Sequence, residues 1–327
     1  MHSGLGMRGE WELYYKEDTF QHLRTIGGRT IMGLRRMDFL LRRAREKQIA
    51  IGAFECWDNL NILGIARAAA ETGLPVIFQA TPAEYEPMGG AEALADMVRF
   101  YVRKFDITAA LHLDHGGTLE QISDCVRSGF TSVMLDASGC EFAENVRLSA
   151  AAAEIAHAGD LSFEAELGHV IGGDGGDGAE SALTVPSEVA EFVKRTHVDC
   201  LAVSIGTVHG DYKGEPRLRL DLLREIASLV DIPLVLHGGS GTPIDQLHAA
   251  IRLGIAKINI CTDIHKAFIA GIQEAVAALT PSVPGNFYRP AVARMTAKTI
   301  EMIRLFADDP RLANVSSQNR RNQHETF

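Results

Sequence analysis

The sequence lacks the features of a secreted disulfide-rich protein and those of a membrane protein. Its 327 residues contain five cysteines, an odd number, and none of them forms a C-x-x-C pair. This usage indicates free thiols in a reducing compartment rather than a disulfide framework. No window approaches the ~20 apolar residues of a membrane span. Residues 1–30 are polar and lack the apolar segment of a signal peptide, so a cytoplasmic protein with no membrane partner is predicted.

An excess of basic residues is also missing. Lysine and arginine together number 32 against 42 acidic residues, which gives a formal net charge of −10. Binding to a nucleic-acid backbone needs a basic footprint, so nucleic acid is not an expected partner. A small anionic ligand stays compatible with this charge, because it senses a few local donors rather than the net charge.

What the sequence does contain is a repeated alternation of short apolar runs with helical stretches. The predicted strands are 49–55, 75–81, 109–115, 132–138, 162–168, 200–206, 233–238 and 256–262. The predicted helices are 59–71, 91–105, 119–128, 143–158, 187–196, 221–230, 243–254 and 265–278, followed by a C-terminal helix at 290–306. Eight such alternations predict an α/β fold, the (β/α)8 TIM barrel. We expect residues 37–310 to form the barrel domain, 1–36 an N-terminal extension and 311–327 a polar tail.

Local signals refine this outline. Ser187 after Pro186 is typical of a helix N-cap, and Thr242 before Pro243 is typical of a cap followed by proline at the first helical position. Two connections are longer than the others, 169–183 with five glycines and 207–218. Long glycine-rich loops on such a barrel are typical of functional lids.

Chemistry-bearing residues gather where the predicted strands end, which is the active-site face of this fold. His115, His209 and His237 fall at or just past the ends of three different strands. Three imidazoles that leave a fourth position open form a catalytic zinc arrangement. Asp114 precedes His115 and is suited either to proton transfer or to orienting a zinc histidine.

A second signal indicates phosphate binding. Gly238, Gly239 and Ser240 lie in a glycine-rich turn that opens a helix after the seventh strand, and Asn259 and Thr262 follow the eighth. Backbone N–H groups at such a turn approach an anion closely. The loops after strands seven and eight are the usual phosphate site of TIM barrels.

Six motifs, taken together, resemble the class II (zinc-dependent) ketose-bisphosphate aldolases over roughly residues 37–278. They are Leu-His-Leu-Asp-His at 111–115, Gly-Phe-Thr-Ser-Val-Met-Leu-Asp at 129–136, Glu-Ala-Glu-Leu-Gly at 164–168, Gly-Thr-Val-His-Gly-Asp-Tyr at 206–212, His-Gly-Gly-Ser-Gly at 237–241 and Lys-Ile-Asn-Ile-Cys-Thr-Asp at 257–263. Their wording is nearer the tagatose-bisphosphate branch of that family.

The resemblance implies a reaction: reversible retro-aldol cleavage of a ketose 1-phosphate or 1,6-bisphosphate to dihydroxyacetone phosphate and an aldehyde. It implies Zn2+ as the cofactor, with a second divalent or a monovalent cation as a further expectation, and a homo-oligomer, either dimer or tetramer. Zinc would act as a Lewis acid on the ketose oxygens, so no Schiff-base lysine is required.

The resemblance also implies roles for individual residues. The zinc ligands would be His115, His209 and His237, with Asp136 and Glu166 at a second metal position. Asp114 would be the proton donor to the aldehyde oxygen, and Asp174 the group that moves the proton at carbon, with Asp177 a weaker candidate. The substrate-binding residues would be Thr81, Gly210, Lys213, Gly238, Gly239, Ser240, Asn259, Ile260, Cys261 and Thr262.

Three positions depart from the family pattern. Glu55 stands where the family commonly has Asn, Asp174 replaces Glu, and the segment 287–290 lacks the usual Asp-Pro-Arg, whose arginine helps to hold the second phosphate. Arg289 and Arg294 are the candidates to replace that arginine. Because these changes gather at the aldehyde end, we hypothesise that the aldehyde is not ordinary glyceraldehyde 3-phosphate.

Two other functions stay open at this point. A metal-dependent hydrolase on the same barrel would use zinc to activate water, although such barrels often begin with H-x-H at the first strand and here that strand ends in Phe-Glu-Cys. A catalytically inactive relative that binds sugar phosphates is the non-enzyme alternative, because fold alone does not guarantee function.

Overall fold

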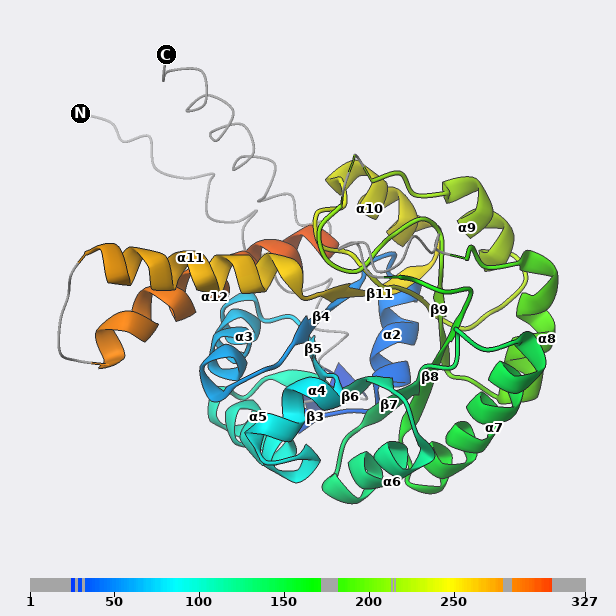
Figure 1. The fold of residues 1–327 in the computed structure, drawn as a ribbon, viewed down its shortest axis with the longest axis horizontal. Helices are drawn as coiled ribbons and strands as arrows, with labels where there is room; N and C mark the ends of the chain where they lie inside the picture. Colours follow the sequence, from blue (N-terminus) through cyan, green and yellow to red (C-terminus); the bar gives the residue numbers. More distant parts are fainter. Residues whose placement is uncertain are drawn as a thin grey trace, which may run out of the picture.

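Eight parallel strands close into a barrel in the computed structural model, which describes residues 25–26, 29–30, 33–171, 182–212, 214, 216–278 and 284–307 (Figure 1). The barrel strands are β4 (Ile51–Glu55), β5 (Val76–Ala80), β6 (Thr108–Gly116), β7 (Ser132–Leu135), β8 (Ser162–Leu167), β9 (Cys200–Val203), β10 (Leu234–Leu236) and β11 (Ile255–Ile260). Closure comes from pairing of β11 with β4 and of β6 with β7. The predicted TIM barrel is therefore confirmed.

A helix follows each strand, and all of these helices except the last cover the outside of the barrel. They are α3 (Asn59–Thr72), α5 (Ala91–Phe105), α6 (Leu119–Ser128), α7 (Phe142–Ala158), α8 (Pro186–Thr196), α9 (Leu220–Ala227), α10 (Ile244–Arg252) and α11 (Thr262–Ala277). Local sequence sets their ends: the Asp58 side chain accepts a hydrogen bond from the backbone N–H of Asn61 to start α3, and Gly73 ends it at φ +70°. The short helices α4 (Pro82–Tyr85) and η1 (Glu86–Met88) lie between β5 and α5.

Strand alternation separates two apolar cores. Phe54, Phe78 and Leu111 belong to the core between the strands and the surrounding helices. Their neighbours in sequence, such as Ile77 and Ala110, face the barrel interior instead and belong to a second cluster. Both sides of each strand are thus buried, which explains the near-continuous apolar runs in the sequence.

The interior cluster is completed by a helix that the sequence analysis did not predict. In α2 (Met37–Glu46), Met37, Leu40, Leu41 and Ala44 are fully buried among the inward-facing residues of the strands. Figure 1 shows α2 inside the ring of strands. Because its partners come from the early part of the strands, α2 closes the amino-terminal end of the barrel and leaves the carboxyl ends for a site.

Three short strands precede α2. β1 (Thr25–Ile26) and β2 (Arg29–Thr30) pair antiparallel, and β3 (Gly33–Leu34) pairs with β6 through Thr108 and Ala109. Part of the predicted N-terminal extension therefore adds to the sheet at the outer edge of the barrel.

The C-terminal helix begins earlier than predicted. α12 (Pro284–Phe306) contains Pro290 in its interior, where the sequence analysis placed its first residue. Packing against α11 stabilises the helix on both sides of the proline. A Cβ atom on Gly271 of α11 would lie 2.6 Å from the Pro290 carbonyl oxygen, so the two backbones are in close contact there. In Figure 1, α11 and the first part of α12 project away from the barrel, whereas the end of α12 packs on α3 and β4.

Several predicted boundaries were also wrong. α8 begins at Pro186 with Val185 at the N-cap, because proline itself fits the first helical turn. α10 begins at Ile244 with Pro243 at the N-cap, because the backbone N–H of Thr242 donates to the Gly239 carbonyl and belongs to the preceding turn. β7 and β9 end about three residues earlier than predicted, at Leu135 and Val203. Of the described helices, none combines the length and apolar character needed to cross a membrane.

Candidate active site

Three histidine rings converge at the carboxyl end of the barrel. The ring centroids of His115 lie 4.8 Å from His237 and 5.0 Å from His209, and those of His209 and His237 lie 5.8 Å apart. Each ring offers a nitrogen within 4.8 Å of the nitrogens of the other two. The structure thus brings together three residues that are distant in sequence, as the strand-end argument predicted.

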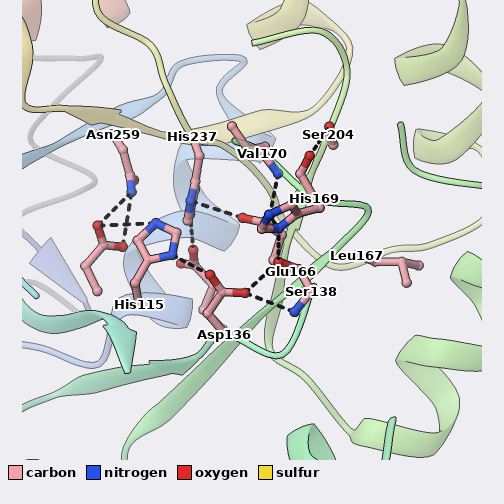
Figure 2. Close-up of polar contacts among 12 residues, drawn as sticks. His115, Asp136, Ser138, Glu166, Leu167, His169, Val170, Ser204, His237 and Asn259 are labelled. Carbon is pink, nitrogen blue, oxygen red and sulfur yellow. Dashed lines mark hydrogen bonds and ion pairs between the residues drawn. The ribbon is translucent and has the colours of Figure 1, made fainter. Parts of the chain in front are cut away.

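Carboxylates hold two of these rings in a defined orientation. His115 Nδ1 lies 2.7 Å from Asp136 Oδ2 (Figure 2). His237 Nε2 lies 2.9 Å from Glu164 Oε1. An ionised carboxylate only accepts hydrogen bonds, so the nitrogen that faces it carries the proton. The opposite nitrogens, His115 Nε2 and His237 Nδ1, are buried and have no hydrogen-bond partner among the described residues, and the same holds for His209 Nε2. His237 Nδ1 does lie in ion-pair contact with a carboxylate oxygen, Glu166 Oε2, at 3.3 Å.

These three unpartnered nitrogens fit a metal ion. A buried polar atom without a partner costs free energy, so such atoms need an explanation, and binding of an ion is one of the usual ones. Three imidazole nitrogens with an open fourth position are the donor set of catalytic zinc sites. The Asp136 and Glu164 contacts are the carboxylate–histidine pairs that commonly orient zinc ligands.

The electrostatics of the rings differ. Burial opposes protonation of His115, but the charge of Asp114 and the hydrogen bond to Asp136 prevail and raise its pKa to about 10. Burial and the neighbouring His115 lower the pKa of His209 to about 4, and they lower the pKa of His237 as well. His115 alone of the three rings thus carries a second proton and a positive charge at neutral pH, and a metal ion would have to displace that proton.

A backbone irregularity lets Asp114 and His115 face the same site although they are adjacent on a strand. His115 has φ +45°, in the left-handed region, and the pairing of β6 with β7 shifts register between Leu113 and Gly116. Such a bulge re-aims a side chain that would otherwise point to the opposite face.

Asp114 is buried, with 3% of its surface exposed, and two amides hold it. Gln79 Nε2 donates to Asp114 Oδ2 at 3.0 Å, and Asn259 Nδ2 donates to Oδ1 at 3.2 Å and to Oδ2 at 3.3 Å. Asp114 Oδ2 lies 4.0 Å from His115 Nε2, so the carboxylate stands next to the metal-facing nitrogen. Gln79 was not identified from the sequence, although it is the inward-facing position two residues after Ile77.

A second group of potential ligands shares His115. Asp136 and Glu166 each offer an oxygen within 4.8 Å of the other and of a His115 nitrogen. Asp136 accepts from the backbone N–H and the hydroxyl of Ser138, at 3.0 and 2.6 Å. Although burial opposes ionisation of Asp136, the His115 contact lowers its pKa, whereas burial and the charge of Asp136 raise the pKa of Glu166 to about 8. This pair could hold a second cation.

Below the histidines lies a buried charge pair that the sequence analysis quoted in motifs but gave no role. Lys257 Nζ donates to Glu164 Oε2 at 2.9 Å and to Oε1 at 3.2 Å, and both side chains are fully buried. Glu164 therefore accepts from both Lys257 and His237. Their inward-facing positions on β8 and β11 were the sequence signal from which this pair could have been predicted.

The predicted phosphate-binding residues lie on two connected loops. The Gly239 N–H donates to the Asn259 carbonyl at 3.1 Å, and Ser240 Oγ accepts from the backbone N–H of Asp263 at 3.3 Å. Gly238 has φ +64°, and a Cβ atom there would lie 2.2 Å from the Val208 carbonyl oxygen, so only glycine fits.

The neighbouring predicted residues fall on the same rim. β11 ends at Ile260, Cys261 is the N-cap of α11, and Thr262 is its first residue. Gly210 has φ +85° in the loop after β9. Thr81 directly follows β5, which pairs with β4 and β6. Asp174, its weaker alternative Asp177, and Lys213 lie outside the described residues.

Comparison with known proteins agrees with this geometry. Residues 35–310 match the protein family described as fructose-bisphosphate aldolase class-II. A fructose-bisphosphate aldolase from Geobacillus stearothermophilus is 39% identical over 292 residues, which cover 86% of this chain and 100% of that protein.

Solved structures of aldolases are also similar to this chain. The YdjI aldolase from Escherichia coli K12 superposes with a TM-score of 0.76 at 32% identity, over 85% of this chain and 99% of that one. The fructose-bisphosphate aldolase from Campylobacter jejuni, at 24% identity and a TM-score of 0.71 over 85% of this chain and 95% of that one, shows the shared fold.

Proposed function

The chain belongs to the class-II fructose-bisphosphate aldolase family, and from that premise we propose that it catalyses zinc-dependent, reversible cleavage of a phosphorylated ketose. The products would be dihydroxyacetone phosphate and an aldehyde, and the substrate a ketose 1-phosphate or 1,6-bisphosphate. One observation carries the proposal: three buried, unpartnered ring nitrogens converge beside a buried carboxylate, Asp114.

The zinc ligands in this proposal are His115 Nε2, His209 Nε2 and His237 Nδ1. Zinc held there would supply a Lewis acid for the negative charge that develops on the ketose oxygens when the carbon–carbon bond breaks. Asp136 and Glu164 hold protons on the opposite nitrogens of His115 and His237 and so orient His115 Nε2 and His237 Nδ1 toward the metal position. Glu166, together with Asp136, is the proposed position of a second divalent or monovalent cation.

Asp114 is the proposed acid–base residue at oxygen. In cleavage it takes the proton of the hydroxyl group that becomes the aldehyde oxygen, and in condensation it returns this proton. The amides of Gln79 and Asn259 fix the carboxylate in one orientation, because they donate to both of its oxygens. A carboxylate held beside the reacting oxygen is the geometry that general acid–base catalysis requires.

The phosphate of the dihydroxyacetone phosphate half would bind the loops after β10 and β11. The proposed contacts are Gly210, Lys213, Gly238, Gly239, Ser240, Asn259, Ile260, Cys261 and Thr262. The hydrogen bond between Gly239 and Asn259 supports this assignment, since it brings the glycine-rich turn and the start of α11 to one place. Backbone N–H groups at such a helix start favour an anion.

Asp174 is the proposed group that moves the proton at carbon. The base of its loop is anchored beside the histidines: the backbone N–H of His209 donates to the Ile171 carbonyl at 2.9 Å, and that of His169 donates to the Ala182 carbonyl at 2.8 Å. Asp174 follows Ile171 by three residues, a reach of roughly 10 Å, which is sufficient for a side chain to meet bound substrate.

We also propose a homo-oligomer, dimer or tetramer. Ile269 and Val276 on α11 and Tyr288 on α12 are exposed by 54%, 56% and 44%, on the part of the helix pair that projects from the barrel. Exposed apolar side chains gathered on a projecting element are typical of an interface. The cytoplasmic location and the tagatose branch stay predictions.

A substrate panel tests the reaction. The zinc-loaded protein should release dihydroxyacetone phosphate from at least one ketose 1-phosphate or 1,6-bisphosphate, and a chelator should abolish the release. His209→Ala should lose this activity, while His197→Ala, at an exposed histidine after α8, should keep it. Zinc-loaded protein that releases nothing from any ketose would instead favour the inactive relative, and hydrolytic activity the hydrolase.

A further inference from the structure

A buried carboxylate, Glu55, lies beside Asp114 at the end of β4, the strand that pairs with β5 and β11. Glu55 has 3% of its surface exposed. Gln79 Nε2 donates to Glu55 Oε2 at 3.0 Å and to Asp114 Oδ2 at 3.0 Å, so one amide nitrogen joins the two carboxylates. Because Asp114 is the proposed proton donor to the aldehyde oxygen, Glu55 stands beside the aldehyde half of the substrate.

A second carboxylate, Glu84, completes this wall. The backbone N–H of Thr81 donates to Glu55 Oε1 at 3.1 Å and to Glu84 Oε2 at 2.8 Å, and the Thr81 hydroxyl also donates to Glu84. Glu84 lies in α4, which packs on β5 and β6 at the mouth of the barrel (Figure 1). Both donors of Thr81, one of the residues implied to bind substrate, are thus already occupied by carboxylates.

The free polar atoms of this wall are acceptors. Gln79 Oε1 and Asn259 Oδ1 are buried, with exposed fractions of 0% and 6% for their residues, and have no hydrogen-bond partner among the described residues. Both belong to the amides that hold Asp114. Buried amide oxygens without a partner call for donors from a bound molecule, and hydroxyl groups supply such donors.

A phosphate group would meet repulsion here instead. The partners of Glu55 and Glu84 are an amide, a hydroxyl and a backbone N–H, none of which neutralises a carboxylate. Burial, Asp114 and Glu84 raise the pKa of Glu55, so the wall already disfavours further negative charge. Arg294, one candidate for the missing phosphate-binding arginine, forms an ion pair with Glu274 on α11. Like charges placed together are an effective means of rejecting a ligand.

We propose that Glu55 and Glu84 determine specificity by excluding a second phosphate, so that the substrate is a ketose 1-phosphate whose aldehyde half is an uncharged polyhydroxy-aldehyde. The carboxylates and the two free amide oxygens accept hydrogen bonds from its hydroxyl groups. This inference rests on the proposed aldolase function and narrows its substrate.

Two aldehydes that differ only by the phosphate provide the test. With zinc-loaded protein and dihydroxyacetone phosphate, kcat/KM for glyceraldehyde should exceed that for glyceraldehyde 3-phosphate by about tenfold or more, as expected when binding a like charge is disfavoured. The Glu55→Asn/Glu84→Gln double variant should lower this ratio by about tenfold or more. Equal or better use of glyceraldehyde 3-phosphate by the wild-type protein, or an unchanged ratio in the double variant, would overturn the inference.

Controls distinguish this result from a general effect of surface charge and from loss of folding. Glu86→Gln removes one negative charge from the same segment at an exposed position, and it should leave the ratio unchanged. If the double variant does not fold, Glu55→Gln, which keeps the side-chain length, replaces it. If zinc-loaded protein shows no aldol reaction with any substrate, the proposed function fails. Calorimetric binding of fructose 1-phosphate against fructose 1,6-bisphosphate then tests the inference alone, and tighter binding of the bisphosphate overturns it.

Discussion

The two ends of the barrel interior are made by the same strands and differ completely in chemistry. At the amino-terminal end, Ile77, Ala110 and Ala202 pack on the apolar face of α2. Two residues further along the same strands stand Gln79, His112 and Ser204, all buried and polar. Since side chains alternate along a strand, one inward-facing row passes from apolar to polar within a single step.

This difference indicates that the amino-terminal end of the barrel stabilises the fold, whereas the carboxyl end carries the function. Apolar burial at the closed end is favourable in itself. Burying Lys257 and Glu164 at the other end costs desolvation free energy that their attraction only partly returns. The polar layer is therefore best explained by what it holds, namely oriented histidines and Asp114. The comparison predicts that changes at the closed end alter stability alone, whereas changes in the polar layer alter activity and metal binding.

Asp114→Asn should have the largest effect on activity. Without a group that exchanges a proton, kcat should fall by about 10²–10⁴-fold, with zinc content unchanged. Steady-state assays and metal analysis on the same preparation measure both. Asp106→Asn, at an exposed position after α5 with φ +51°, is the matched control, because asparagine tolerates that conformation. A kcat within threefold of wild type for Asp114→Asn would remove Asp114 from the proposed chemistry.

Leu41→Ala at the closed end should affect stability instead. Leu41 is fully buried in α2, so truncation should lower the free energy of unfolding by about 2–5 kcal/mol, while kcat/KM of the folded enzyme stays unchanged. Urea denaturation and assays at low temperature separate the two quantities. Arg42→Ala, at the next, exposed position, should change neither. Loss of kcat/KM in folded Leu41→Ala would contradict the division between the two ends.

Neutralising the buried pair of Lys257 and Glu164 should weaken metal binding without lowering stability, the opposite of the effect expected for Leu41→Ala. In Lys257→Met/Glu164→Gln, His237 loses its charged acceptor, so zinc affinity should fall by about 10–100-fold. The free energy of unfolding of the metal-free protein should stay equal or rise, because both buried charges are gone. Competition with a zinc-binding dye and chemical denaturation measure these. The surface pair in Lys298→Met/Glu301→Gln is the control. Unchanged zinc affinity would show that Glu164 does not position His237.

The pH dependence of zinc binding is a smaller but specific effect. The pKa of about 10 for His115 and of about 8 for Glu166 mean that both bind a proton at pH 7 without metal, while His209, with a pKa of about 4, does not. Zinc must displace the proton of His115, so affinity should still rise with pH between 8 and 9. Calorimetry in buffers of different ionisation enthalpy counts the protons. No proton release at pH 8 would mean that the histidines are neutral there.

The sequence predicted the order of strands and helices because each repeat carries its own apolar pattern and turn signals. It predicted the three histidines because strand ends meet on one face of a barrel. It did not predict α2, although Met37, Leu40, Leu41 and Ala44 have helical spacing. A helix inside the barrel has no counterpart in the alternating pattern, so its apolar face had no predicted partner.

The contacts around the site could not be predicted from the sequence. Gln79 belongs to no recognisable motif, and its role depends on meeting Glu55 and Asp114 across strand ends. Glu84 belongs to the capping box that starts at Thr81, but that motif does not predict that both residues stand beside Glu55. The early start of α12 depends on its close contact with α11, and helix propensity alone does not predict such a contact. The residue types at the strand ends could be predicted from the sequence. The partners of each side chain could not, because they come together only when the barrel closes.

The most direct test of the account is a zinc titration of metal-free protein with simultaneous measurement of dihydroxyacetone phosphate release from a ketose phosphate. The account predicts no release without zinc, and then a linear rise in activity that ends at one tightly bound ion per chain, which His115, His209 and His237 would hold. Release by the metal-free protein, or no release at full zinc occupancy, would contradict it.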